Sequence, residues 1–553
     1  MLGSDQMSDR SYLQYLLALI LFAFYSYLSM FGTAYFGDFG FTVTNYKYFI
    51  SNPDSVYFWF ANWVTLAAGW SVEALFSQYG MKIFIIACAA IYSVNFLLAD
   101  AIVKLCFGKK YTVVVFLTSL FVLTGSSGYI NRYSLTALFL NILLFFLAKY
   151  LFQGKREYLI LAGFVGGVLC FVRIPNLAVI SLCVVFFLGN DFKKGITDAL
   201  FFIVSWVVGC CVVLLAIKLV GHYEYFILGL KVLIAKGKGV TENHNLFTMI
   251  ERLLKDTLSA VALGGPFAIA TFAVYSTLKG STRLGLKKIL TVAGFIVLAT
   301  LIAYLAHRWL DLRFWHRYLF TGYILISGVV LLSITKNISF RIFIAALLIV
   351  SFVPMVGSAN GLTRNIGGLW VLIPVVICKF LIPILSEENN FQVRYRKLVA
   401  GSILTLGILL WGIRIYPHLL YVAQCDVYDS KYTKQYDTEE NVGKCQDELD
   451  KIGKFTSVGD SMITYEQSSM LYYLLDTVPY LHSPEPIFWG PQLQGVIDQV
   501  VGENLNLPIV VESVIDLKIL GHEKNKETMH TFLSKNKYKL VWSNENFTVY
   551  LPK

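Results

Sequence analysis

Apolar positions fill the first three quarters of the chain in long runs, whereas the last quarter alternates between short apolar and polar segments. About thirteen runs lie between Tyr12 and Ile415. Each is close to the ~20 residues that a helix needs to cross the hydrocarbon core of a bilayer. The pattern therefore predicts a polytopic α-helical membrane protein. The predicted spans are 12–33, 82–103, 111–125, 134–152, 157–172, 176–190, 198–220, 257–278, 289–306, 317–335, 340–357, 368–385 and 398–416.

The short fifth and sixth runs could instead form one broken pair. With thirteen spans, the odd count places the last quarter of the chain on the side of the membrane opposite to the N-terminus. We therefore divide the chain into a membrane domain, 1–416, with a long first outward loop at 34–81, and a water-soluble domain, 417–553.

The water-soluble domain is predicted to be a small α/β fold. Its pattern favours a strand and loop at 454–465, helices at 466–475, 491–501 and 523–535, a buried strand at 507–512, and a terminal hairpin of 538–542 and 547–551. It contains no Gly-rich phosphate loop, nucleophile elbow or metal-ligand cluster in its sequence. A binding or lid role is thus favoured over chemistry.

Composition supports this division. The 553 residues are 56% hydrophobic with a mean hydropathy of +0.62, which excludes a soluble globular protein. The net charge is +11, yet residues 417–553 hold 12 Lys, no Arg and 19 acidic residues. Basic residues beside membrane helices indicate orientation and contact with anionic lipid headgroups, so no nucleic-acid partner is expected.

The orientation follows from one set of short basic loops. They are 104–110, 149–156, 193–194, 283–288, 336–341 and 394–397, and they are predicted to be cytoplasmic by the positive-inside rule. The N-terminus is then cytoplasmic and the C-terminal domain extracytoplasmic, in a bacterial-type inner (plasma) membrane. Seven of the nine cysteines lie in or beside apolar spans and are expected to pack there. Cys425 and Cys445 lie in the water-soluble domain, where an oxidising compartment would allow a disulfide.

Asp38 is the first candidate for chemistry. It stands just beyond the outer end of the first span, and Gly37 and Gly40 would allow a tight turn that points it into a cavity. A carboxylate at an apolar boundary loses hydration, so it either meets a cation or becomes a stronger base. The alternative is a helix cap or interfacial turn. The surrounding loop is rich in aromatics, which favours short helices along the membrane surface.

The second candidate is a set of cations on the outward side, against the positive-inside trend. Such groups are costly near lipid unless something anionic meets them, and phosphate oxygens suit both Arg and Lys. The alternative for each is contact with lipid headgroups or pairing with Asp311 or Glu242. The set comprises Arg132, Arg173, Lys231, Lys236, Lys238, Arg308, Arg313, Arg317, Arg364, His244, His307 and His316.

With these features the chain resembles the GT-C superfamily of polyprenyl-phosphate-sugar-dependent glycosyltransferases. The resemblance covers the whole layout. Its most specific elements are Gly37-Asp38-Phe39-Gly40 followed by 46–49, and Trp315-His316-Arg317-Tyr318-Leu319-Phe320 at the start of a later span.

The resemblance implies a polyprenyl-phosphate-linked sugar as donor, membrane lipids as surroundings, and a lipid, glycan or protein as acceptor. Asp38 would be the general base or would orient a metal, and direct attack would invert the sugar carbon. The residues implied to hold the donor phosphate are Lys47, Arg132, Arg173, Lys236, His244, Arg308, Arg313, His316, Arg317 and Arg364.

One departure from the family pattern concerns a metal. The common pattern has two acidic residues together in the first loop, but Phe39 and Gly40 follow Asp38 here. A divalent cation, Mg²⁺ or Mn²⁺, is therefore only an option, with Asp54 or Glu73 as a second carboxylate.

Two other functions compete with sugar transfer. A polysaccharide polymerase or a lipid-linked-oligosaccharide flippase could use similar outward arginines, although Asp38 and the soluble domain argue against both. A secondary transporter would show charged residues in mid-span and a repeated half. Most spans lack such residues and no clear repeat is found, so a transporter is least favoured.

Overall fold

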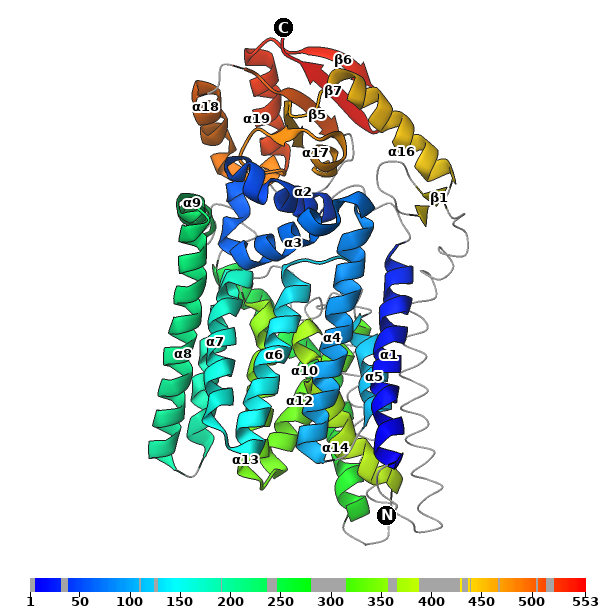
Figure 1. The fold of residues 1–553 in the computed structure, drawn as a ribbon, viewed down its shortest axis with the longest axis vertical. Helices are drawn as coiled ribbons and strands as arrows, with labels where there is room; N and C mark the ends of the chain where they lie inside the picture. The colour runs from blue at the N-terminus through cyan, green and yellow to red at the C-terminus, as the bar shows by residue number, and fades with distance from the viewer. Residues whose placement is uncertain are drawn as a thin grey trace.

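The computed structural model describes residues 5–30, 38–108, 111–123, 128–189, 191–235, 246–279, 315–356, 366–386, 428–429, 436–437, 439–465, 468–503, 506–513 and 522–553. A bundle of long helices forms one part, and a small α/β domain caps one end of it (Figure 1). The N-terminus lies at the opposite end of the bundle and the C-terminus at the top of the cap.

Each predicted span that falls within the described residues coincides with a helix. The spans 289–306 and 398–416 lie outside them. The helices of the bundle are α1 (Asp5–Ser29), α4 (Lys82–Phe107), α5 (Thr112–Leu123), α6 (Arg132–Gln153), α7 (Arg156–Val172), η3 (Ile174–Leu188), α8 (Phe192–Leu219), α10 (Leu246–Lys279), α12 (Trp315–Ile334), α13 (Ile338–Phe352) and α14 (Leu372–Ser386).

Within the described residues, six helical segments are long and apolar enough to cross a membrane. They are Tyr12–Ser29, Lys82–Phe107, Arg132–Gln153, Phe192–Leu219, Arg317–Ile334 and Ile338–Met355. This confirms the predicted fold class of a helical membrane protein with a small α/β domain. The count of thirteen spans stays a prediction.

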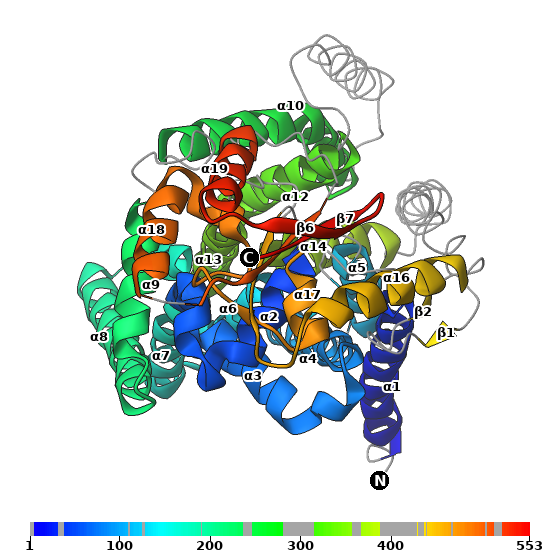
Figure 2. The same ribbon diagram turned by 90° about the horizontal axis from the view of Figure 1, so that it is seen from above.

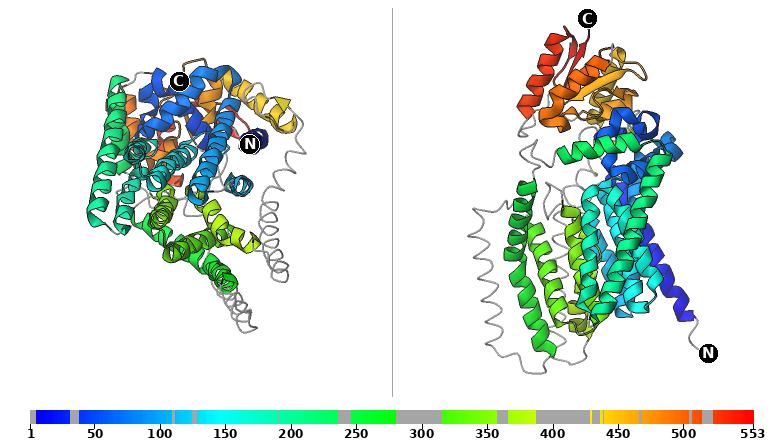
Figure 3. Two further views of the ribbon diagram at one scale, coloured as in Figure 1. Left: turned by 60° about the horizontal axis from the view of Figure 1, so that its bottom comes forward. Right: turned by 90° about the vertical axis from the view of Figure 1, so that its left-hand side faces the viewer.

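The first outward loop forms short helices, as predicted. They are α2 (Asp38–Ser51), η1 (Pro53–Asn62), α3 (Trp63–Phe76) and η2 (Ser77–Tyr79). The Asn52 side chain accepts a hydrogen bond from the Ser55 amide, and Pro53 opens η1, so this helix begins with two favourable residues. α2 and α3 lie between the bundle and the cap, and α9 (Tyr223–Ala235) crosses the same level (Figures 1 and 3).

The cap, hereafter the tail domain, comprises the described residues from 428 to 553. Its five-stranded sheet has the order β4-β3-β5-β7-β6, in which β3 pairs in parallel with β4 and β5, and β7 pairs antiparallel with β5 and β6. The strands are β3 (Ser461–Tyr465), β4 (Val478–Pro479), β5 (Ile509–Ser513), β6 (Lys539–Ser543) and β7 (Phe547–Leu551), and β1 (Tyr428–Asp429) pairs with β2 (Tyr436–Asp437) apart from them.

The helices of the tail domain surround this sheet (Figure 2). They are α16 (Glu439–Ile452), η8 (Gly453–Phe455), α17 (Met470–Leu475), η9 (Pro486–Gln492), α18 (Leu493–Glu503) and α19 (His522–Lys535). The predicted helices, the strand at 507–512 and the terminal hairpin are all present, whereas α16 was not predicted. The predicted domain boundary at 417 lies outside the described residues.

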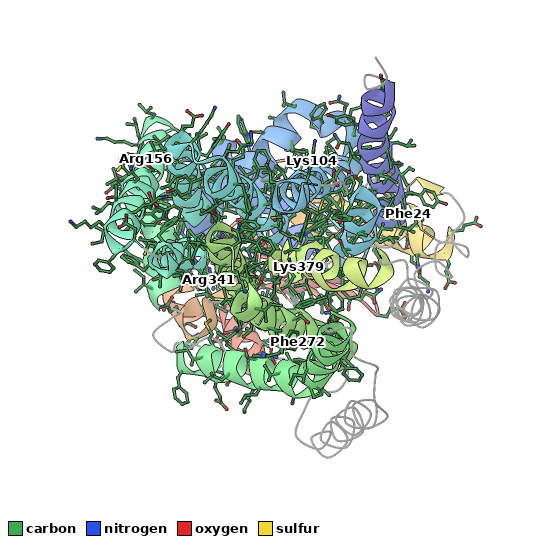
Figure 4. All side chains as sticks on the ribbon, turned by 90° about the horizontal axis from the view of Figure 1, so that it is seen from below. Phe24, Lys104, Arg156, Phe272, Arg341 and Lys379 are labelled. Carbon is green, nitrogen blue, oxygen red and sulfur yellow. The ribbon has the colours of Figure 1, made fainter. Side chains whose placement is uncertain are left out.

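The end of the bundle away from the tail domain carries basic side chains from the loops predicted to be cytoplasmic. Seen from below, Lys104, Arg156 and Arg341 lie around this face (Figure 4). Which end of the bundle meets the cytoplasm stays a prediction. So does the disulfide, because Cys445 is buried in α16 but Cys425 lies outside the described residues.

Candidate functional site

Asp38 is the first residue of α2, and its side chain is exposed. A carboxylate at a helix N-terminus is stabilised by the unpaired backbone amides there. The backbone carbonyl of Asp38 accepts a hydrogen bond of 2.7 Å from Thr42 Oγ1. The next residue, Phe39, stacks on Tyr129 with ring centroids 4.3 Å apart. The start of α2 is therefore attached to the loop between α5 and α6.

The same loop ends at Arg132, the first residue of α6. Asn131 caps this helix by accepting hydrogen bonds from the Tyr133 and Ser134 amides, which fixes the direction in which Arg132 leaves the backbone. The guanidinium lies over two rings, 5.4 Å from the Trp59 centroid and 5.1 Å from that of Tyr133. It also donates to the Tyr133 hydroxyl at 3.3 Å, and the charge of Asp38 attracts it.

A second guanidinium approaches Tyr133. Arg173 follows α7 directly and is only 4% exposed. It donates to the carbonyls of Pro354 at 2.6 Å and Val356 at 3.1 Å, and lies 5.5 Å from the Tyr133 centroid.

Burial lowers the pKa of Arg173 to about 10; Tyr133 opposes this shift and the positive charge of Arg132 adds to it. Arg173 is therefore still charged at neutral pH. Two guanidiniums that repel each other electrostatically form a site that favours an anion.

Tyr129 is half-buried and lies close enough to Asp38 to feel its charge. Loss of hydration raises the pKa of the Tyr129 phenol well above its usual value, and the negative charge of Asp38 raises it further. The phenol thus keeps its proton at neutral pH and can donate a hydrogen bond. We call Asp38, Tyr129, Arg132, Tyr133 and Arg173 the Asp38 cluster. It combines one proton acceptor, a phenol donor and two cations.

Lys47 has partners elsewhere. Its ammonium forms an ion pair with the Asp476 carboxylate and donates to the Tyr473 carbonyl at 3.1 Å, both in the tail domain. The structure therefore places it against the tail domain, and its role in binding phosphate stays a prediction.

The two other carboxylates of the first loop also bind the tail domain. The Asp54 backbone carbonyl accepts a hydrogen bond of 2.9 Å from His482 Nδ1. The Asp54 carboxylate lies 3.3 Å from the same nitrogen. Glu73 accepts from the Tyr473 hydroxyl at 3.1 and 3.2 Å.

Among the remaining predicted residues, Arg317 lies in the first turn of α12, beside Tyr318, whose hydroxyl donates to Asp256 at 2.9 Å. His316 belongs to the same turn, but its side chain is outside the described part. Lys236, His244, Arg308, Arg313 and Arg364 lie outside the described residues. Their predicted contact with a phosphate stays untested.

The described residues do not form a metal site. They contain no group of three or more His, Cys, Asp or Glu side chains that could hold a metal ion. Around Asp38 the structure places phenol and guanidinium donors, which are not ligands for Mg²⁺ or Mn²⁺. The role proposed below uses only these side chains, and a divalent cation stays a prediction.

Sequence reasoning missed the aromatic part of the cluster. Trp59, Tyr129 and Tyr133 were not singled out as site residues. The adjacency of Arg132 and Tyr133 was a signal, because Arg readily stacks on aromatic faces. The approach of Trp59 has no sequence signal, since it depends on how η1 packs above α6.

No protein-family model matches the chain. No curated protein matches it either. Solved structures that it resembles include the archaeal oligosaccharyltransferase AglB from Archaeoglobus fulgidus, in complex with an inhibitory peptide and a dolichol-phosphate. The identity is 11%, the overlap covers 91% of this chain and 70% of AglB, and the TM-score is 0.47.

ArnT from Cupriavidus metallidurans in the apo state is also similar, at 13% identity, with 99% of this chain and 98% of ArnT covered and a TM-score of 0.41. Both are GT-C superfamily membrane glycosyltransferases, the superfamily that the sequence resembles. Because both TM-scores lie below 0.5, the argument for function rests on the chain's own residues.

Proposed function

We propose that this chain is a membrane glycosyltransferase that moves a sugar from a polyprenyl-phosphate donor to an acceptor on the extracytoplasmic face. Its product would belong to a cell-envelope glycan, lipid or glycosylated protein. The observation that carries the proposal is the Asp38 cluster at the tail-domain end of the bundle, in which the exposed Asp38 carboxylate attracts Arg132, and Arg132 and Arg173 both lie near the Tyr133 ring.

The cluster contains the groups that this transfer needs. Asp38 accepts the proton of the acceptor hydroxyl as its oxygen forms a bond to the sugar carbon. The bond between that carbon and the phosphate oxygen breaks, and its electron pair leaves with the phosphate. Arg132 and Arg173 stabilise the added negative charge. The carbonyls of Pro354 and Val356 use two of the five N–H donors of Arg173, which leaves others for phosphate oxygens.

The stereochemical outcome follows from the number of carboxylates. Asp54 and Glu73 bind tail-domain side chains, so the cluster offers one carboxylate. A single base without a second carboxylate as nucleophile favours direct attack, and direct attack inverts the sugar carbon.

The first test is sugar release from a panel of polyprenyl-phosphate sugars by the purified protein, compared with Asp38→Asn. Loss of a general base should lower turnover by about 10²–10⁴-fold. Asp54→Asn is the matched control: the backbone carbonyl that accepts from His482 is unchanged, so turnover should be retained. Normal turnover in Asp38→Asn would contradict the proposal, and a folded protein inactive with every donor and acceptor would favour a flippase or polymerase.

A further inference from the structure

α2, the helix that begins with Asp38, lies between two parts of the protein. On one side Phe39 stacks on Tyr129, and the Tyr46 hydroxyl donates to the Ile130 carbonyl at 3.1 Å. These contacts attach α2 to the bundle. The opposite side meets the tail domain, which is far away in the sequence but adjacent in space (Figure 1).

The contacts with the tail domain follow one stripe of α2. They involve Gly40, Phe41, Thr44, Lys47 and Tyr48, which have the spacing of a single helix face. Thr44 Oγ1 donates to the Ser469 carbonyl at 3.0 Å, and the Tyr48 hydroxyl donates to the Thr477 carbonyl at 2.8 Å. Lys47 lies between these two, on Tyr473 and Asp476.

The stripe ends two residues from Asp38, at a backbone contact. A Cβ atom on Gly40 would lie 2.5 Å from the Met470 amide nitrogen and 2.7 Å from its Cα. α17 therefore approaches α2 as closely as a glycine allows, with backbone on both sides. A shift of α17 would move the first turn of α2 and Asp38 with it.

The acidic partner of Lys47 holds an uncommon backbone conformation. Asp476 follows α17 with φ 61° and ψ 34°, the left-handed region in which glycine is usual at a helix end. A glycine there would relieve the backbone but remove the carboxylate that Lys47 binds. Asp is one of the few non-glycine residues that adopt this region readily, so Asp476 can end α17 and still supply the carboxylate that joins the two domains.

We propose that the tail domain is a positioning element for the reaction, which fixes Asp38 by holding α2 along the Gly40–Thr44–Lys47–Tyr48 stripe. This inference rests on the proposed function of Asp38. Thr44, Lys47 and Tyr48 are positioning residues that act through the placement of α2. The chemical role of the tail domain is then to keep the base at its distance from the arginines.

The test combines a measurement of α2 with a measurement of turnover. Lys47→Met and Asp476→Asn each remove one side of the ion pair, and Asn also tolerates the left-handed backbone. Hydrogen exchange of the amides in 38–51 should become faster in both variants. kcat should fall about tenfold, since small displacements of a base are costly, while KM for the donor should stay within about twofold.

Two comparisons strengthen the result. The double variant Lys47→Met/Asp476→Asn should behave as Lys47→Met, because Lys47→Met already removes the ion pair together with the hydrogen bond to the Tyr473 carbonyl. Lys47→Arg should restore most of kcat. Lys451→Met is the matched control, since it removes an ion pair that lies within α16, Lys451 to Asp447 at 3.5 Å.

The outcomes separate this inference from the proposed function. Unchanged hydrogen exchange in α2 would overturn the positioning role of the tail domain. Faster exchange with unchanged kcat would overturn it as well. A raised donor KM in Lys47→Met alone would instead assign Lys47 to the donor phosphate and overturn its positioning role. Faster exchange in a protein that transfers no sugar from any donor would refute the proposed function, and the positioning role with it, while the domain contact itself would stand.

Discussion

Arg132 contributes both a positive charge and a fixed side-chain geometry to the Asp38 cluster. Its guanidinium lies over the rings of both Trp59 and Tyr133 and is attracted by the charge of Asp38. A planar cation stacks on rings in a way that a Lys ammonium does not, so the rings keep the fork of N–H donors in one orientation. The cluster therefore depends on the geometry of Arg132 as well as on its charge.

This dependence predicts that Arg132→Lys weakens donor binding although the charge is kept. A cation–π contact shielded from water is worth about 1–2 kcal/mol, so KM for the donor should rise about tenfold. Arg132→Ala should raise it further. The assay is transfer at varied donor concentration.

Arg156 of α7 offers a matched control, because its guanidinium lies 5.4 Å from the ring centroid of Phe201 on α8. Arg156→Lys makes the same exchange at the end of the bundle away from the tail domain (Figure 4). Its donor KM should equal that of the unmodified protein. Equal changes at both arginines would mean that the effect is not local to the cluster.

At the residue scale, the sequence predicted the charges of the site better than their neighbours. Asp38, Arg132 and Arg173 were selected by charge beside an apolar boundary, and in the structure Arg132 interacts electrostatically with each of the other two. Lys47, which the family resemblance implied as a phosphate ligand, binds the tail domain instead. Its helix spacing with Thr44 and Tyr48 defines a face of α2, but no sequence pattern tells which part of the protein covers that face.

At the element scale, small residues let helices of the bundle approach closely. A Cβ atom on Gly167 of α7 would lie 2.1 Å from the Trp206 carbonyl and 2.8 Å from the Cys210 amide nitrogen of α8. A Cβ atom on Gly209 of α8 would lie 2.3 Å from the Phe164 carbonyl oxygen of α7. In a membrane, where apolar side chains gain little by leaving lipid, such backbone contact is a main source of helix association.

We expect Gly167→Ala to lower the free energy of unfolding by about 1–3 kcal/mol, because the added methyl group meets backbone that cannot move aside. Gly166→Ala is the control. Its Cβ would meet only side chains, the nearest being Trp206 at 3.2 Å, and these can adjust. Titration with a denaturing detergent would measure both. A loss at Gly166 as large as at Gly167 would show that backbone contact is not the cause.

The elements were largely predictable, for a physical reason. A run of apolar residues long enough to cross a bilayer has few alternatives to a helix, so the spans were found from length alone. α16 was missed because its composition is polar. Its buried residues Val442, Cys445, Leu449 and Ile452 recur every three or four positions, and that stripe was the available signal.

At the scale of the whole molecule, the groups at the two ends of the bundle bear on how the chain is oriented in a membrane. The tail domain and the Asp38 cluster lie at one end (Figure 1), and Lys104, Arg156 and Arg341 lie around the other (Figure 4). Because positive charge is retained on the cytoplasmic side, the basic end should face the cytoplasm. The cluster would then meet donors whose sugar has already crossed the membrane.

This orientation predicts the accessibility of two engineered cysteines. Val458 is 80% exposed in the tail domain, and Lys155 is exposed between α6 and α7 beside Arg156. In intact cells, a membrane-impermeant maleimide should label Val458→Cys at once and Lys155→Cys only after permeabilisation. The parent chain, with exposed Cys211 replaced, is the background for both. The reverse pattern would place the Asp38 cluster on the cytoplasmic side. The donor would then have to react before its sugar crosses the membrane. The proposed extracytoplasmic reaction would be wrong.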